Sequence, residues 1–171
     1  MWHNVTPYVG NSHVYYTGNQ SMAQSLACVY VHTVFSTKNR QPAIHRDWRV
    51  DLFNVVGAGM KTLKCNSIIV GGVADHLHIL FELGRTIALS EAVGKIKSGS
   101  SNWINENHWR AVPFQWQGGY AAFSVSLSAV EPTREYIRTQ ESHHKTHSFQ
   151  DELRECFRKA GIEWDERYVW A

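Results

Sequence analysis

Two histidines one residue apart have the type and spacing of metal ligands. His76 and His78 flank Leu77. In a β-strand, residues two apart point to the same face, so the imidazoles lie side by side while Leu77 points into the core on the opposite face. Neighbouring imidazoles bind divalent metals, and two protein ligands leave the coordination shell incomplete. The pattern therefore predicts part of a metal site, the alternative being a polar sheet face that happens to carry two histidines.

A tyrosine and a glutamine four residues apart form a second chemical pair. In a helix over residues 132–144, Tyr136 and Gln140 lie on one face. Glu135 and Glu141 lie off that face. A phenol can attack a phosphodiester as a nucleophile, and an amide oxygen can complete a metal shell. Either residue alone is equally typical of an ordinary amphipathic helix.

Other residues compete for both roles. Tyr120, beside Gly118 and Gly119, is a second candidate nucleophile, but no glutamine follows it at helical spacing. A histidine cluster lies near the end of the 132–144 helix and consists of His143, His144 and His147. No cysteine or carboxylate ligand accompanies this cluster at close spacing. We therefore interpret it as a helix-end cluster favoured by the helix dipole, and we prefer the tyrosine on the helix as nucleophile.

The hydrophobic pattern predicts the elements that position these residues. Apolar and β-branched runs indicate strands over residues 26–35, 66–73, 76–83 and 115–126. Apolar spacings of three to four indicate helices over residues 46–63, 89–105, 132–144 and 148–160. Ser148 is the expected cap of the last helix, and only Ala74 and Asp75 separate the second and third strands, which predicts a tight hairpin. The order predicts an α+β, ferredoxin-like βαββαβ fold, with a four-stranded antiparallel sheet, helices on one face and further C-terminal helices.

Length and composition fit one globular domain. The chain has 171 residues, of which 43% are hydrophobic and 19% charged, which excludes disordered, collagen-like and coiled-coil proteins. A net charge of +2 permits nucleic-acid binding without requiring it. Three widely spaced cysteines and the lack of an apolar span or signal segment lead us to expect a cytoplasmic protein with no membrane partner. Residues 1–24 lack periodicity, so we expect them to form an N-terminal extension. A single domain is expected over residues 25–171.

Five blocks of the sequence, together with the paired histidines, resemble the single-tyrosine HUH transposases. These are small insertion-sequence enzymes whose relatives include proteins associated with bacterial repeat elements, and HUH denotes histidine, hydrophobe, histidine, as in residues 76–78. The matching blocks follow in order: YVHTVFSTK (30–38), VAD (73–75), WQGGYAAFSVS (116–126), YIRTQESHH (136–144) and GIEWDERYVW (161–170). The resemblance extends from Met22 to Ala171.

The resemblance implies a metal-dependent transposase that cleaves and rejoins single-stranded DNA at the ends of a mobile element. Tyr136 matches the nucleophile, His76 and His78 the paired metal ligands, and Gln140 a third ligand of Mg²⁺ or Mn²⁺. Attack leaves a 5′-phosphotyrosine and a free 3′-OH, and strand transfer reverses this chemistry. A phenol has a pKa of about 10 and is mostly protonated near pH 7, so its attack requires a metal that polarises the phosphate. Because the phosphotyrosine conserves bond energy, rejoining requires no nucleotide cofactor.

The resemblance also implies partners. The substrate is single-stranded DNA with hairpin ends, and the protein is a homodimer in which the tyrosine-bearing helix of one subunit can complete the metal site of the other. We expect DNA contacts from basic and aromatic residues, namely Lys38, Arg40, Lys95, Lys97, Trp116 and Tyr120. Each of these is also typical of a solvated charge or a core aromatic. Three alternatives stay open: a domesticated nuclease that nicks repeat hairpins, a hairpin-binding protein without activity, and a ferredoxin-like metal-binding module.

Overall fold

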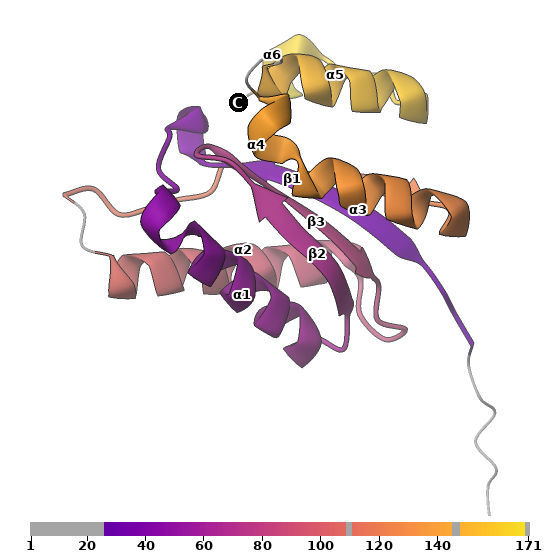
Figure 1. Cartoon of the computed structure of the whole chain (residues 1–171), viewed down its shortest axis with the longest axis horizontal. Helices are drawn as coiled ribbons and strands as arrows, with labels where there is room; N and C mark the ends of the chain where they lie inside the picture. The colour runs from indigo at the N-terminus through magenta and orange to yellow at the C-terminus, as the bar shows by residue number, and fades with distance from the viewer. Residues whose placement is uncertain (1–25, 109–110, 145–147, 170–171) are drawn as a thin grey trace, which may run out of the picture.

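A four-stranded antiparallel sheet forms the centre of the fold (Figure 1). The computed structural model describes residues 26–108, 111–144 and 148–169, so the expected extension and His147 lie outside the described residues. The strand order is β2-β3-β1-β4. The strands are β1 (Tyr30–Ser36), β2 (Asn66–Gly72), β3 (His76–Glu82) and β4 (Ala121–Val125). Because β1 pairs antiparallel with both β3 and β4, the predicted ferredoxin-like α+β fold is confirmed.

Two long helices cover one face of this sheet. They are α1 (Arg46–Thr62) and α2 (Leu89–Asn107). The alternate β3 residues Leu77, Ile79 and Phe81 point toward them and are fully buried in the larger hydrophobic core. Their burial fixes the register of β3, because a shift by one residue would turn this apolar set to the other face. His76 and His78 consequently lie on the face opposite these helices.

The C-terminal helices cover the opposite face of the sheet (Figure 1). They are α3 (Val130–Arg138), α4 (Gln140–His143), α5 (Phe149–Ala160) and α6 (Glu166–Val169). A second, smaller core forms there between the sheet residue Val34 and the α5 residues Phe149, Leu153 and Phe157. The two histidines of β3 therefore lie between the sheet and the C-terminal helices.

Several boundaries differ from the sequence prediction. Strand β1 begins at Tyr30 rather than at residue 26, and Leu26 and Val29 before it are exposed. Strand β4 begins at Ala121, because Gly119 adopts a positive φ of 65° and interrupts the extended backbone. The predicted helix over residues 132–144 is two helices, separated at Thr139, whose φ of −97° and ψ of 12° are not helical.

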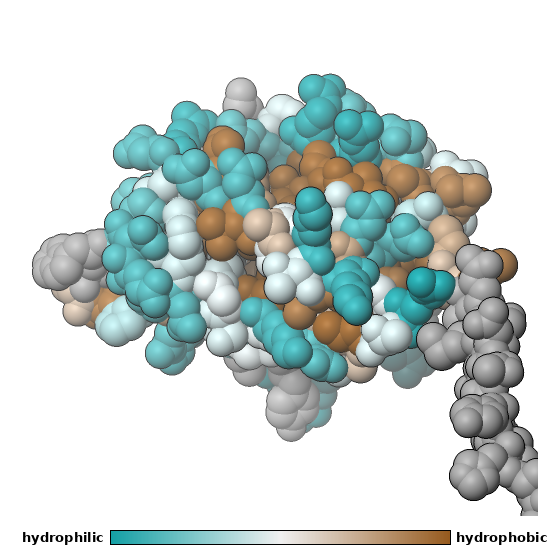
Figure 2. Space-filling view, turned by 90° about the horizontal axis from the view of Figure 1, so that it is seen from below, coloured by the Kyte–Doolittle hydropathy of each residue, from teal (hydrophilic) through white to brown (hydrophobic). Residues whose placement is uncertain are grey.

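The remaining features concern turns and the surface. Two short 3₁₀ helices, η1 (Lys38–Arg40) and η2 (Leu127–Ala129), follow β1 and β4. Figure 2 shows one face of the molecule, on which hydrophilic side chains predominate and hydrophobic ones show between them. The cysteines Cys28, Cys65 and Cys156 are free thiols. Across the described ranges, no helix combines the length and apolar character needed to cross a membrane.

Candidate active site

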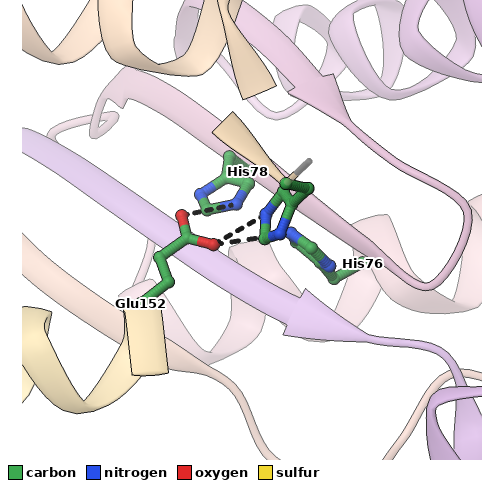
Figure 3. A group of neighbouring side chains, drawn as sticks. His76, His78 and Glu152 are labelled. Atoms are coloured by element: carbon green, nitrogen blue, oxygen red, sulfur yellow. Dashed lines mark ion pairs between the residues drawn. The ribbon is translucent and has the colours of Figure 1, made fainter. Parts of the chain in front are cut away.

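The paired histidines of β3 are the centre of the candidate site. The side chains of His76 and His78 are 0% and 1% exposed and lie on the same sheet face, as predicted. Each ring is held through Nδ1: that of His76 lies 2.8 Å from Asp75 Oδ1, and that of His78 lies 3.0 Å from His32 Nε2. Both rings consequently direct Nε2 toward the C-terminal helices, where Glu152 lies (Figure 3).

The partners of these rings determine which nitrogen carries the proton. Burial alone would raise the pKa of Asp75, but its hydrogen bond to His76 and the charges of His76 and His144 lower it, so the carboxylate accepts the Nδ1 proton of His76. Burial lowers the pKa of His32 to about 4, so His32 is neutral and can accept a hydrogen bond from His78 Nδ1. A histidine whose Nδ1 carries the proton presents the lone pair of its Nε2 atom, which in His76 and His78 faces Glu152.

A close approach of β2 and α3 brings the tyrosine to the histidine pair. Gly71 pairs with His78 across the sheet. A Cβ on Gly71 would lie 2.7 Å from Ile137 Cγ2 and 2.8 Å from the Ile137 carbonyl oxygen, so only glycine allows α3 this position. Tyr136 precedes Ile137, and its ring centroid lies 5.9 Å from that of His78 and 6.2 Å from that of His32.

Tyr136 and Gln140 meet at one carboxylate although the helix breaks between them. The Tyr136 hydroxyl donates a hydrogen bond to Glu152 Oε1. The amide nitrogen of Gln140 donates to the same oxygen at 3.1 Å. Gln140 is 1% exposed, and its Oε1 has no hydrogen-bond partner among the residues that the structure describes. The two residues that sequence spacing placed on one helical face thus do converge in space.

Glu152 lies among the histidines (Figure 3). Its carboxylate oxygens lie 2.8 Å from His144 Nε2, 3.4 Å from His78 Nε2 and 3.8 Å from His76 Nε2. Burial, followed by repulsion from Asp75, raises the pKa of Glu152 to about 8. One donor atom from each of His76, His78, His144 and Glu152 lies within 4.8 Å of all the others, and such a group could hold a divalent metal.

Sequence reasoning missed Glu152 and interpreted His144 differently. The helix-end interpretation of His144 did not foresee that its ring would lie against His76, at 4.6 Å between ring centroids. A signal for Glu152 was present, because this acidic residue shares the apolar face of α5 with Phe149 and Leu153. The expected cap is confirmed, because the Ser148 hydroxyl accepts a hydrogen bond from the Asp151 amide. Helix α5 therefore begins directly after Ser148, and Glu152 lies on its buried face. The structure describes the backbone of His143 but not its side chain.

A cavity of about 580 Å³ opens beside the tyrosine. Its lining includes His32, Tyr136 and Glu152 together with acidic and basic residues of α5, namely Asp151, Glu155, Arg158 and Lys159. The phenol of Tyr136 is half-buried, so it is accessible from this cavity. The cavity therefore gives a ligand access to Tyr136 and Glu152 from outside, whereas His76 and His78 do not line it.

Two of the basic candidates for DNA contact, Lys38 and Lys97, hydrogen-bond to the segment that contains Trp116 and Tyr120, whereas Lys95 does not. Lys38 is exposed and donates to Gln115 Oε1 at 2.7 Å. Lys95 is exposed and forms an ion pair with Glu91. Lys97 is half-buried and donates to the carbonyl oxygens of Gln117 and Gly119, and burial lowers its pKa.

The two aromatic candidates differ in exposure. Trp116 is 9% exposed, contacts Phe35 edge-on at 4.9 Å between ring centroids, and donates its indole proton to Ser100. Its ring is part of the core and its faces are not available to a base. Tyr120 is 40% exposed and, together with Arg40, lines a separate cavity of about 350 Å³ beside α5.

Comparison with known proteins gives a family and a fold. A family model described as IS200-like transposase matches residues 25–140. A candidate transposase from Deinococcus radiodurans has a similar structure, with 16% identity, a TM-score of 0.55, and coverage of 71% of this chain and 97% of that one. The structure of a REP-associated tyrosine transposase bound to a REP hairpin is 10% identical, with a TM-score of 0.49 and coverage of 70% and 68%. Among curated proteins, no significant match was found.

Proposed function

The chain belongs to the family of IS200-like transposases, which act in DNA transposition, and from this premise we propose that it cleaves and rejoins single-stranded DNA at the ends of a mobile element. The family match agrees with the resemblance of the sequence to single-tyrosine HUH transposases. The observation that best supports the proposal is that Glu152 contacts both the Tyr136 hydroxyl and His78 Nε2 and, together with Tyr136, lines an access cavity.

In the proposed reaction, Tyr136 is the nucleophile. Its oxygen attacks the scissile phosphorus, the bond from phosphorus to the 3′-oxygen breaks, and the products are a 5′-phosphotyrosine and a free 3′-OH. The hydrogen bond to Glu152 Oε1 orients the phenol, and Glu152, whose pKa burial raises to about 8, accepts the phenol proton in its ionised form and can pass a proton to the leaving 3′-oxygen. Attack by a 3′-OH on the phosphotyrosine reverses these steps and rejoins the strands.

The donor atoms at the site fit a divalent ion. His76 Nε2 and Gln140 Oε1 are buried and have no hydrogen-bond partner among the described residues, which is typical of atoms that bind an ion. We propose that His76, His78 and Gln140 hold Mg²⁺ or Mn²⁺. When bound, the ion supplies Lewis-acid polarisation of the phosphate and stabilises the leaving oxygen. Gln140 directs its nitrogen at Glu152, so ligation through its oxygen requires rotation of the amide.

Single-stranded DNA with hairpin ends is the proposed partner. Tyr120 and the cations Lys38, Arg40 and Lys95 are exposed and are the proposed contacts to its bases and phosphates. Lys97 contributes by holding the backbone next to Tyr120, and the buried Trp116 supports the same loop from the core. The cavity beside Tyr136 would receive the scissile nucleotide. We further propose that the protein acts as a homodimer in the cytoplasm.

A covalent-adduct assay tests the proposed chemistry. The full-length protein is mixed with single-stranded DNA from the flanks of its own gene, in Mg²⁺, Mn²⁺ or a chelator, and run on a denaturing gel. We expect a metal-dependent protein–DNA band that is lost in Tyr136→Phe and kept in Tyr120→Phe, the variant of the competing tyrosine.

Each other result has a distinct meaning. A band that persists in Tyr136→Phe would move the nucleophile elsewhere. Tight hairpin binding without any band would favour a binding protein without activity. Adding a second DNA end with a free 3′-OH separates a transposase, which joins the strands, from a nuclease that only nicks them.

A further inference from the structure

The cluster of potential metal ligands extends beyond the residues that the family resemblance supplies. His144 and Glu152 both follow residue 140, where the match to the family model ends. We propose that these two residues bind the metal together with His76 and His78, and that the completed site selects a first-row transition ion such as Mn²⁺ over Mg²⁺. This inference deepens the proposed function and rests on it for the role of the ion in cleavage.

The distances between the donor atoms support a shared ion. The carboxylate of Glu152 approaches His144 Nε2 at 2.8 Å and His78 Nε2 at 3.4 Å, which are typical separations of neighbouring ligands. The four donor atoms all lie within 4.8 Å of one another. Four ligands at about 2.1 Å from one ion lie roughly 3.4 Å apart, so the closer donor pairs already have this spacing and the most separated ones need to approach by about 1 Å.

The two oxygens of Glu152 have different neighbours. Oε1 accepts the hydrogen bonds from Tyr136 and Gln140. Oε2 lies nearest to His144 Nε2, at 2.8 Å, and to His76 Nε2, at 3.8 Å. One carboxylate can therefore bind an ion through Oε2 while it orients the nucleophile through Oε1. This arrangement would link the ion directly to the attacking phenol.

The chemistry of the donor set determines the choice of ion. Three imidazole nitrogens and one carboxylate oxygen form a nitrogen-rich set. Imidazole suits first-row transition ions, whereas Mg²⁺ prefers oxygen ligands and retains several waters. With only His76, His78 and the oxygen of Gln140, the site would be less selective. The addition of a third imidazole from His144 shifts the preference toward Mn²⁺ and its heavier neighbours.

The packing of α5 explains how residues outside the sheet reach the ion. Phe149, in the first turn of α5, stacks on the His76 ring at 4.3 Å between centroids. The Ser148 cap fixes the start of the helix, and Glu152 lies in its first turn. An ion bound by His144, Glu152 and the β3 histidines would hold α5 against β3. Binding of the ion should therefore also stabilise the docking of α5 on the sheet.

Metal titration of the DNA-free, full-length protein tests the proposal. Binding of Mn²⁺ and Mg²⁺ is measured by calorimetry, and the ligand field is followed through the visible absorption of bound Co²⁺. The variants are His144→Ala and Glu152→Gln. Two matched controls change the same residue types away from the cluster: His45→Ala at the start of α1 and Glu91→Gln on α2.

We expect both test variants to lose Mn²⁺ affinity by at least about tenfold, since removal of even an outer partner of a ligand costs that much. Their Co²⁺ spectra should change, and their preference for Mn²⁺ over Mg²⁺ should fall. Both controls should bind like the unmodified chain. Circular dichroism in chelator confirms that each variant is folded, and His144→Asn replaces the alanine variant if that one fails to fold.

Two results would overturn the proposal. Unchanged affinity and spectra in both folded variants would mean that neither residue is a ligand. Tighter binding in Glu152→Gln would mean that the carboxylate occupies the place that the ion needs. The adduct assay is independent of these measurements: an adduct with unaltered metal binding in the variants contradicts this inference alone, and metal binding without an adduct contradicts only the proposed function.

Discussion

His32 lies outside the group of potential metal ligands and contacts His78 directly, which limits the orientation of the His78 ring. It lies on β1, is 6% exposed, and stacks on His78 with 5.2 Å between ring centroids. Its Nε2 contacts His78 Nδ1 at 3.0 Å, the atom opposite the one that faces the cluster. Partners of this kind fix the tautomer of a ligand histidine. A buried neutral histidine also makes the folded state sensitive to acid.

The pKa of His32 predicts a loss of stability in mild acid. Burial lowers its pKa to about 4 in the folded protein, from 6.5 in an exposed histidine. Because the folded pKa is the lower one, the unfolded state binds the proton first, and folding free energy is lost as the pH falls from about 6.5 toward 4. The shift corresponds to about 3 kcal/mol.

Urea unfolding in chelator at pH 7 and at pH 4.5 measures this effect. His32→Gln cannot titrate in this range, so its free energy of unfolding should fall less between the two pH values than that of the unmodified chain. Acidic groups such as Asp75 make the same contribution to the pH dependence of the free energy of unfolding in both proteins, so this contribution cancels in the comparison. Parallel pH dependences in the two proteins would contradict the assignment of a buried, neutral His32.

At the scale of elements, the contact between β2 and α3 determines where the tyrosine lies. A methyl group on Gly71 would overlap the side chain and carbonyl of Ile137. We predict that Gly71→Ala forces α3 away from the sheet, destabilises the fold by about 1–3 kcal/mol, and slows adduct formation by about tenfold to a hundredfold as Tyr136 is displaced.

The matched control for this variant is Gly94→Ala. Gly94 lies on the exposed side of α2, and a Cβ there would have no neighbour within 4 Å. Alanine should therefore stabilise the helix by about 0.5–1 kcal/mol and leave the adduct rate unchanged. Thermal unfolding and single-turnover adduct kinetics give both quantities. An adduct rate in Gly71→Ala equal to that of the control would show that α3 does not need this close approach.

The same elements show what the sequence could and could not predict. The alternation around Leu77 correctly predicted which face of β3 carries the histidines, because strand periodicity is a local property of the chain. The burial of Trp116 depends on packing against the distant residues Phe35 and Ser100. Glu152 joins the site only because α5 packs across the sheet, and no local spacing relates it to His76. The strands, helices and paired histidines were thus predictable, whereas the complete cluster was not.

At the scale of the whole molecule, one chain assembles every element of the candidate site. Strand β3 supplies the histidine pair, α3 and α4 supply Tyr136 and Gln140, and α5 supplies Glu152. The net charge of +2 gives only a weak overall attraction for DNA, so local contacts must provide affinity. The proposed homodimer would contain two such sites, and its subunits could use their tyrosines in their own site or in that of the partner.

The contacts of Tyr136 predict that cleavage begins within one subunit. Its hydroxyl donates to Glu152 of the same chain, and its ring lies beside His78 of the same chain. Exchange of the tyrosine-bearing helices between subunits, where it occurs, would then follow cleavage. Two reciprocal heterodimers distinguish the arrangements, once light scattering has established that the protein is dimeric and differently tagged subunits have been co-purified.

The first heterodimer pairs His76→Ala with Tyr136→Phe, and the second pairs the unmodified chain with a subunit that carries both substitutions. A site within one subunit leaves the first heterodimer without an intact site and the second with one, so only the second should form the covalent adduct. A site shared between subunits gives the reverse result, because the tyrosine of one subunit must then meet the histidines of the other. An adduct from the first heterodimer alone would therefore show that the contact between Tyr136 and Glu152 belongs to a state that precedes helix exchange.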